Sequence, residues 1–173
     1  MSDGGRFRFF DGAVDGTACD AVRDRVCAAG FSRYEIGDRG RYELGVSHAE
    51  PWLFARLATL ARAQVHMAVS VETWRWTRLR HGDYATFKDD ARRACDGVVE
   101  VCLDVSAAAS DQGQIIYRTA GTAATVPQRP GGVAIIDRRG PMARYERYLG
   151  VRFGAGEIVR LTLVLRPRPD PAS

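Results

Sequence analysis

The sequence predicts an α+β fold that is mainly β, an antiparallel sandwich or barrel closed by two helices on one side. Two N-terminal segments carry apolar residues at helical spacing, whereas short β-rich runs separated by Gly, Pro and Asp follow from residue 73. The 173 residues are 46% apolar. This composition suits one domain with a real core and excludes a disordered chain, so we treat residues 1–173 as a single domain.

The first helix is expected from about residue 18 to residue 29, after a short strand at 7–10. Thr17 or Asp15 can cap its start, and Gly30 provides a stop. Its apolar positions recur at helical spacing: Cys19, Val22, Val26 and Ala29.

The second helix is expected from Pro51, a residue suited to a first helical turn, to about residue 68. A strand at 31–36 and a polar loop at 37–40 precede it. His66, near the end of the helix, is most simply a core or capping residue.

Seven β-rich runs follow. They span residues 74–80, 98–105, 114–119, 123–126, 133–137, 144–149 and 158–165. Three prolines after residue 165 cannot continue a central strand. We therefore expect residues 1–5 and 167–173 to be disordered tails.

The net charge of +4 says little about partners, because the basic residues are so uneven in type. Of the 25 basic residues, all but one, Lys88, are arginine, as expected from a GC-rich coding bias. The densest arginine stretch is better explained as a solvated strand edge or an acidic-ligand site than as a nucleic-acid surface. It consists of Arg138, Arg139, Arg144, Arg147 and Arg152.

The sequence indicates a cytoplasmic protein with no membrane partner. No segment approaches the roughly 20 apolar residues of a membrane helix, and the N-terminus lacks the regions of a signal peptide. The four cysteines form no Cys-x-x-Cys pair and have no zinc-finger spacing. Free, buried thiols in a reducing compartment are the simplest interpretation. They are Cys19, Cys27, Cys95 and Cys102.

The order of several segments resembles the prolyl-hydroxylase-like branch of the 2-oxoglutarate/Fe(II) oxygenases. These are the segments FRFFDGAVDGTACDAVRDRVCAAGF, WRWTRLRHGDYATFKDD, GQIIYR, VPQRPGGVAIID and GEIVRLTLVL. The resemblance covers nearly the whole chain and implies a double-stranded β-helix, the cupin-like jelly roll, flanked by two N-terminal helices. It also implies that Arg160, on the last strand, is the arginine that binds the far carboxylate of 2-oxoglutarate.

The iron ligands of that family, two His and one carboxylate, are not reproduced. Counted from Gly82-Asp83-Tyr84, the first His falls on Lys88 and the carboxylate on Asp90. The distal His falls in a segment that offers only Arg144, Tyr145 and Arg147. The three histidines of the chain match none of these positions; they are His48, His66 and His81.

Lys88 is therefore the strongest candidate for a site residue. A protonated ammonium repels a divalent cation, and its charge beside Asp90 can substitute for the metal. Such a pair can be structural, or a desolvated Lys can act as acid, base or Schiff-base nucleophile.

We take Lys88, Asp90 and Tyr145 as candidate catalytic residues. Candidate substrate-binding residues are Arg160, Arg144, Tyr117, Trp76 and Arg78, although a core role explains Trp76 at least as well. No metal site and no cofactor is predicted, the alternative being Fe(II) and 2-oxoglutarate.

Three functions remain open. The first is a metal-independent enzyme that uses the emptied cofactor pocket for cyclisation, isomerisation or elimination of a small organic substrate in bacterial biosynthesis. The second is a working oxygenase that recruits His81 or His48. The third is a non-catalytic small-molecule-binding protein in which Lys88 and Asp90 form a structural plug.

Overall fold

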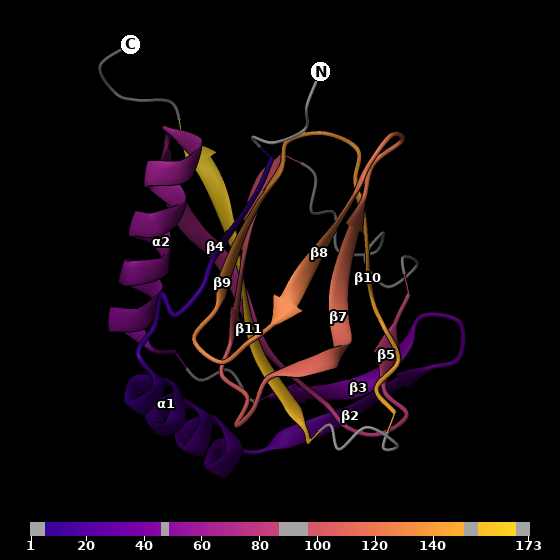
Figure 1. Ribbon diagram of the computed structural model, residues 1–173. Helices are drawn as coiled ribbons and strands as arrows, with labels where there is room; N and C mark the ends of the chain where they lie inside the picture. The colour runs from indigo at the N-terminus through magenta and orange to yellow at the C-terminus, as the bar shows by residue number, and fades with distance from the viewer. Residues whose placement is uncertain (1–5, 46–48, 87–96, 151–155, 169–173) are drawn as a thin grey trace.

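The computed structural model describes residues 6–45, 49–86, 97–150 and 156–168. Within these ranges the chain forms one 11-stranded sheet that curls on itself, with both helices on one face (Figure 1). The elements are β1 (Phe7–Phe10), α1 (Gly16–Ala29), β2 (Phe31–Ile36), β3 (Gly40–Gly45), α2 (Pro51–Val65), β4 (Ala68–Leu79), β5 (Tyr84–Ala85), β6 (Val98–Asp104), β7 (Ser110–Arg118), β8 (Ala123–Gln128), β9 (Val133–Arg138), β10 (Ala143–Glu146) and β11 (Ile158–Arg168).

The sheet has two facing halves. Strands β9, β6, β11 and β4 form the half that the helices cover, and β5, β10, β7 and β8 form the other. Strand β3 joins the halves, because it pairs with both β4 and β5. This arrangement confirms the expected mainly β, jelly-roll-like architecture with two helices.

The helices begin and end as local sequence dictates. The Asp15 side chain accepts a hydrogen bond from the backbone N–H of Ala18, and Gly30 ends α1 with φ 96°. Pro51 opens α2, and His66 ends it in the left-handed conformation, two residues before the expected end. Neither helix, within the described ranges, is long and apolar enough to cross a membrane.

The main hydrophobic core lies between the helices and the outer face of the sheet. Because side chains alternate along a strand, every second residue of the covered half meets the helices. Members from helices and strands include Val22, Val26, Leu53, Leu57, Trp76, Val101, Ile135 and Leu161. The other face of the same strands points into the space between the two halves.

Two local expectations were wrong. Residues 40–45, for which no strand is predicted, form strand β3, in which Tyr42 and Leu44 alternate with charged residues. Strand β11 continues through Pro167 to Arg168, into the segment expected to be disordered. Beyond Leu165 it pairs with β4 alone, so the missing N–H of Pro167 costs no ladder bond on the other side.

Candidate functional site

A cluster of buried charged side chains lies between the two halves of the sheet. We name it the interior charge cluster. It comprises Glu100 from β6, Arg138 from β9, Arg144 and Glu146 from β10, Arg160 from β11, and Tyr117 from β7. Each of these side chains is at least nine-tenths buried, so each charge needs a partner within the protein.

Strand periodicity brings these side chains together. In β6, Val99, Val101 and Leu103 belong to the helix-facing core, which turns Glu100 inward. In β10 the residues at 144 and 146 are buried and those at 143 and 145 are not. Tyr117 lies directly opposite Arg144 in the β10–β7 register.

One half of the cluster is centred on Glu100. Nη1 of Arg138 donates to Oε2 of Glu100 at 2.8 Å, and Nε of Arg144 lies 3.0 Å from Oε1. The Tyr117 hydroxyl donates to the same Oε1 at 2.7 Å and accepts from Nε of Arg144 at 3.2 Å. Burial raises the pKa of Glu100, but Arg144 and Arg138 outweigh it and hold that pKa at about 2. The carboxylate is therefore ionised.

The other half is centred on Glu146. Nη2 of Arg144 donates to Oε1 of Glu146 at 2.5 Å, and Nη1 of Arg160 lies 3.2 Å from Oε2. Burial opposes ionisation here too, yet Arg144 and Arg160 lower the pKa of Glu146. Arg144 thus bridges the two carboxylates, since it contacts Glu100 and Glu146 at once.

Arg160 reaches a third set of partners. Its Nη2 donates to the carbonyl of Gly113 at 3.0 Å and also to the side-chain oxygen of Gln128. Gly113 has φ +63°, and a Cβ at this position would collide with Ile158. The left-handed backbone conformation therefore favours glycine at the position whose carbonyl accepts from Arg160.

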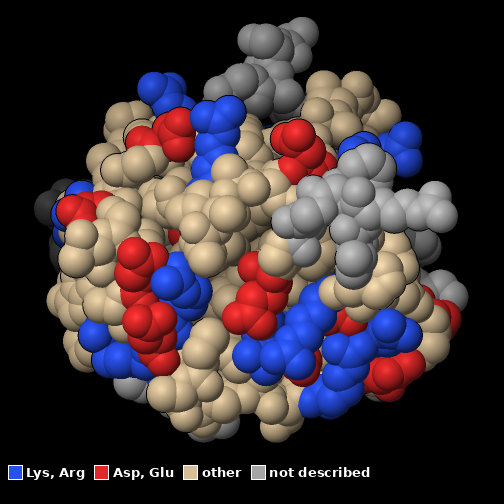
Figure 2. Space-filling view, turned by 60° about the horizontal axis from the view of Figure 1, so that its bottom comes forward, with Lys and Arg blue, Asp and Glu red and all other residues tan. Residues whose placement is uncertain are grey.

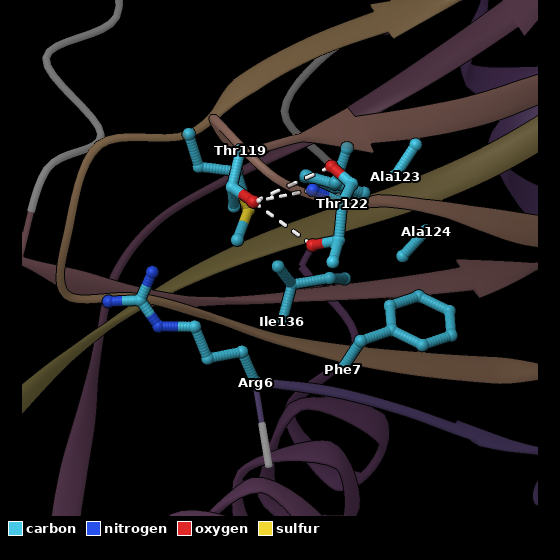
Figure 3. A pocket seen from close by; sticks show the side chains of 9 residues that line it. Arg6, Phe7, Thr119, Thr122, Ala123, Ala124 and Ile136 are labelled. Atoms are coloured by element: carbon cyan, nitrogen blue, oxygen red, sulfur yellow. Dashed lines mark hydrogen bonds between the residues drawn. The ribbon is translucent and has the colours of Figure 1, made fainter. Parts of the chain in front are cut away.

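A small pocket opens at the end of the sheet where β7 turns into β8. Its volume is about 230 Å³. Figure 3 shows it between the β7–β8 turn and the start of β1. Its lining consists of Arg6, Phe7, Tyr117, Thr119, Thr122, Ala123, Ala124, Ile136 and Met142. Tyr117 is thus shared between the pocket and the interior charge cluster.

No protein-family model and no curated protein matches the chain. Solved structures do match it. An oxidoreductase of the 2OG-Fe(II) oxygenase family from Burkholderia pseudomallei has a TM-score of 0.72 at 12% identity, covering 95% of this chain and 86% of that one. A prolyl-4-hydroxylase from Pseudomonas putida has a TM-score of 0.66 at 14% identity over 95% and 94% of the two chains. The α-ketoglutarate dependent epimerase SnoN from nogalamycin biosynthesis has a TM-score of 0.65 at 12% identity over 95% and 81%.

The fold is that of the 2-oxoglutarate/Fe(II) oxygenases. This agrees with the resemblance seen in the sequence. Identities of 9–14% among such neighbours establish the fold of this chain and leave its chemistry to its own residues.

The described residues do not fit the iron ligands of the oxygenase fold. They contain no group of three His, Cys, Asp or Glu side chains that could hold a metal. Of the three histidines, His66 ends α2 and His81 is an exposed residue after β4; His48 lies outside the described residues. The inward position near the expected distal His holds Arg144, a permanent cation.

The candidate residues of the sequence are only partly brought together. Arg144, Arg160 and Tyr117 meet in the interior charge cluster. Tyr145 lies on the opposite face of β10 from Arg144, outside the cluster. Lys88 and Asp90 lie outside the described residues, and so does Cys95.

Trp76 and Arg78 lie on the helix-facing side of β4. Trp76 is fully buried in the main core. Arg78 lies over the Phe31 ring at 4.2 Å and bonds Glu43 at 2.5 Å. The sheet therefore separates both residues from Arg160.

Two cluster members went unrecognised in the sequence. Glu100 was the stronger signal, because a carboxylate among the apolar residues of 98–103 must be paired when that strand is buried. Glu146 lies among polar residues, so nothing in the sequence around it indicates that it is buried. The dense arginine stretch was also misjudged in part, since Arg138 and Arg144 are buried ion-pair partners and not a solvated strand edge.

The face toward the β2–β3 end carries interspersed positive and negative side chains (Figure 2). Residues of β2 and β3 also form ion pairs: Arg33 bonds Asp83 at 2.7 Å, and Arg78 bonds Glu43. Asp83 is fully buried and also accepts from the backbone N–H of Arg80 at 2.8 Å. The Asp83 contacts stabilise the turn after β4, and the described residues of this face form no continuous basic stripe.

Proposed function

We propose that this protein binds and converts a small organic molecule without iron or 2-oxoglutarate, using an oxygenase-like scaffold. The conversion is a cyclisation, isomerisation or elimination in bacterial natural-product biosynthesis. One observation carries the proposal: Arg144 and Glu146 provide an internal cation and carboxylate in the space where the oxygenase fold is expected to hold its metal and cosubstrate.

The cation argues against a metal. A metal ligand must offer a lone pair, whereas a guanidinium has none and stays charged at every working pH. Burial disfavours the charge, but Glu146 and the neighbouring groups raise the pKa of Arg144 well above its ordinary value. Arg144 would therefore repel a divalent ion at this position.

The carboxylate argues against 2-oxoglutarate. Arg160, which the resemblance assigns to the far carboxylate of the cosubstrate, already lies 3.2 Å from Glu146. At that distance Nη1 of Arg160 makes no hydrogen bond, but a second carboxylate there would lie beside the ionised Glu146, and two buried like charges in contact are unfavourable.

Related scaffolds give the reaction class its support. SnoN, an α-ketoglutarate dependent epimerase from nogalamycin biosynthesis, is an example of this fold acting on a natural product. The absence of the cosubstrate in the proposed reaction rests on the charges of this chain alone. In this chain, acid–base chemistry would come from Lys88 with Asp90, as the sequence predicts. Tyr145, the third candidate catalytic residue, faces away from the cluster and is not assigned a role in that chemistry.

Small-molecule binding without chemistry is the second candidate. The ion pairs within the cluster favour it, since each carboxylate of the cluster already contacts two arginines. A cluster of this kind can serve stability alone.

Calorimetric titration with Ni(II), as a redox-inert substitute for Fe(II), and with 2-oxoglutarate tests the proposal. We expect no stoichiometric binding of either and no change of Tm after EDTA treatment. Tight 1:1 binding of both would overturn it and identify a working oxygenase.

Lys88→Ala and Lys88→Arg then separate the two candidates. Both variants are compared with the unmodified protein for Tm and for turnover of a candidate substrate from neighbouring biosynthetic steps. Lost turnover in a folded Lys88→Ala variant supports catalysis, and unchanged turnover rejects Lys88 as a catalytic group. Loss of folding alone favours a structural plug.

A further inference from the structure

The pocket beside the β7–β8 turn has walls of two kinds. Phe7, Ile136 and Met142 provide apolar surface, and Ala123 and Ala124 leave the space open because their side chains are short. On the other side, Thr119 and Thr122 line the turn, with their hydroxyl oxygens 3.0 Å apart. In Figure 3 these threonines lie across the pocket from Phe7 and Arg6.

Tyr117 also lines the pocket. The Tyr117 hydroxyl is engaged with Glu100 and with Nε of Arg144. Burial raises the pKa of Tyr117 well above its ordinary value, so the phenol stays neutral. A ligand in the pocket therefore meets a neutral Tyr117 side chain, which does not repel an anion.

Arg6 supplies the positive charge at the rim. Its guanidinium makes no hydrogen bond or ion pair with any side chain in the described part of the chain. Asp137, the acid close enough to interact with Arg6 electrostatically, is bonded instead to Arg139, with Nε at 2.9 Å and Nη2 at 2.5 Å. The charge of Arg6 is thus left available to an anion.

The size of the pocket limits the ligand. A cavity of roughly 150 Å³ already holds a benzene-sized molecule. The volume of about 230 Å³ found here adds room for one small polar group, and is below the range of roughly 300–1,000 Å³ typical of drug-sized ligands.

We propose that this pocket binds a small aromatic or branched aliphatic monocarboxylate, with its apolar part on Phe7, Ile136 and the Tyr117 ring and its carboxylate at Arg6. The inference deepens the proposed function, because it names the ligand class of that small molecule. It also connects ligand and cluster, since Tyr117 contacts both.

Benzoate and 3-methylbutanoate are the probes, with benzamide as the neutral analogue of benzoate. Binding is followed by calorimetry and by ligand-observed NMR on the full chain. We expect saturable binding of at least one carboxylate, and weaker binding of benzamide.

Three variants locate the site. Arg6→Gln should weaken carboxylate binding by about tenfold, because a charge-assisted contact is lost. Ala124→Phe should abolish binding by filling the pocket, and Ala124→Val, a smaller change, should weaken it if the Phe variant does not fold. Arg8→Gln is the matched control, since Arg8 lies two residues further along the chain, is exposed on β1 and is absent from the pocket lining.

Absence of saturable binding up to about 10 mM would overturn the inference. So would binding that survives in folded Ala124 variants, or equal loss in Arg6→Gln and Arg8→Gln. These results are independent of the metal titration: binding of Ni(II) with 2-oxoglutarate would overturn the proposed function whether or not benzoate binds at Arg6.

Discussion

Nη1 of Arg160 lies 3.2 Å from Oε2 of Glu146, with only 2% and 3% of the two side chains exposed. The arginine comes from the last strand and the glutamate from β10, in opposite halves of the sheet. The pair therefore ties the two halves together across the interior. It also neutralises the arginine that would otherwise attract an external carboxylate.

Glu146→Gln should strongly destabilise the protein. The amide keeps the shape of the side chain but removes the negative charge that Arg144 and Arg160 share. Breaking a buried ion pair on one side costs about 3–5 kcal/mol, and urea unfolding measures that loss. Glu72→Gln is the control, since the Glu72–Arg166 pair is exposed and should contribute less than about 1 kcal/mol. Equal losses in the two variants would refute the interior role of Glu146.

Stability should decrease as the pH falls from about 5 toward 2. The pKa of Glu100 is lowered from 4.5 to about 2 by the adjacent arginines, once burial is overcome. A group with a lowered folded-state pKa stabilises the protein above its unfolded pKa and loses that contribution as pH falls through the folded value. The contribution at neutral pH is about 3 kcal/mol.

Measuring the free energy of unfolding at several pH values checks this dependence, with Glu100→Gln as the comparison. That variant should be less stable at neutral pH and less sensitive to acid. Asp104 has the opposite sign, because burial raises its pKa in the folded protein. Identical pH slopes for the unmodified protein and Glu100→Gln would contradict the assignment to Glu100.

Arg144→Lys should not be a conservative change. Arg144 reaches Glu100 through Nε and Glu146 through Nη2, and a single ammonium cannot reproduce two contacts in different directions. We expect a loss of about 2–3 kcal/mol in urea unfolding. Arg147→Lys, an exposed change on the same segment, should stay within about 0.5 kcal/mol. A similarly small effect at Arg144 would show that charge alone matters there.

Tyr117→Phe should cost about 1–2 kcal/mol, because Glu100 loses a buried hydrogen-bond donor. Tyr145 is adjacent to Arg144 in sequence but lies on the opposite face of β10, outside the cluster. Tyr145→Phe should therefore be nearly neutral. Thermal unfolding of the two variants side by side gives the comparison. Should Tyr145→Phe be the more damaging change, the assignment of inner and outer faces of β10 would be wrong.

Trp76→Ala should destabilise by about 3–5 kcal/mol through a cavity in the main core. A ligand-wall role would instead leave stability nearly intact. Trp52→Ala serves as control, since Trp52 is 46% exposed. Calorimetric unfolding distinguishes the two roles.

Local sequence was sufficient for most of the elements. Asp15, Gly30 and Pro51 set the helix limits through capping and backbone preferences that depend only on near neighbours. Strand β3 was missed even though Tyr42 and Leu44 alternate, because a short strand between a loop and a helix has few periods to display.

The sequence by itself determined the fold class, the helices and the place of Arg160 on the last strand. Only the tertiary structure decided that Glu146 partners that arginine, that Arg144 bridges two carboxylates, and that Trp76 and Arg78 face the helices. Periodicity and capping act within a few residues, whereas these pairings depend on the register of strands far apart in the chain. A shift of one residue in β10 would turn Arg144 and Glu146 outward and Tyr145 inward, and nothing local in the sequence excludes it.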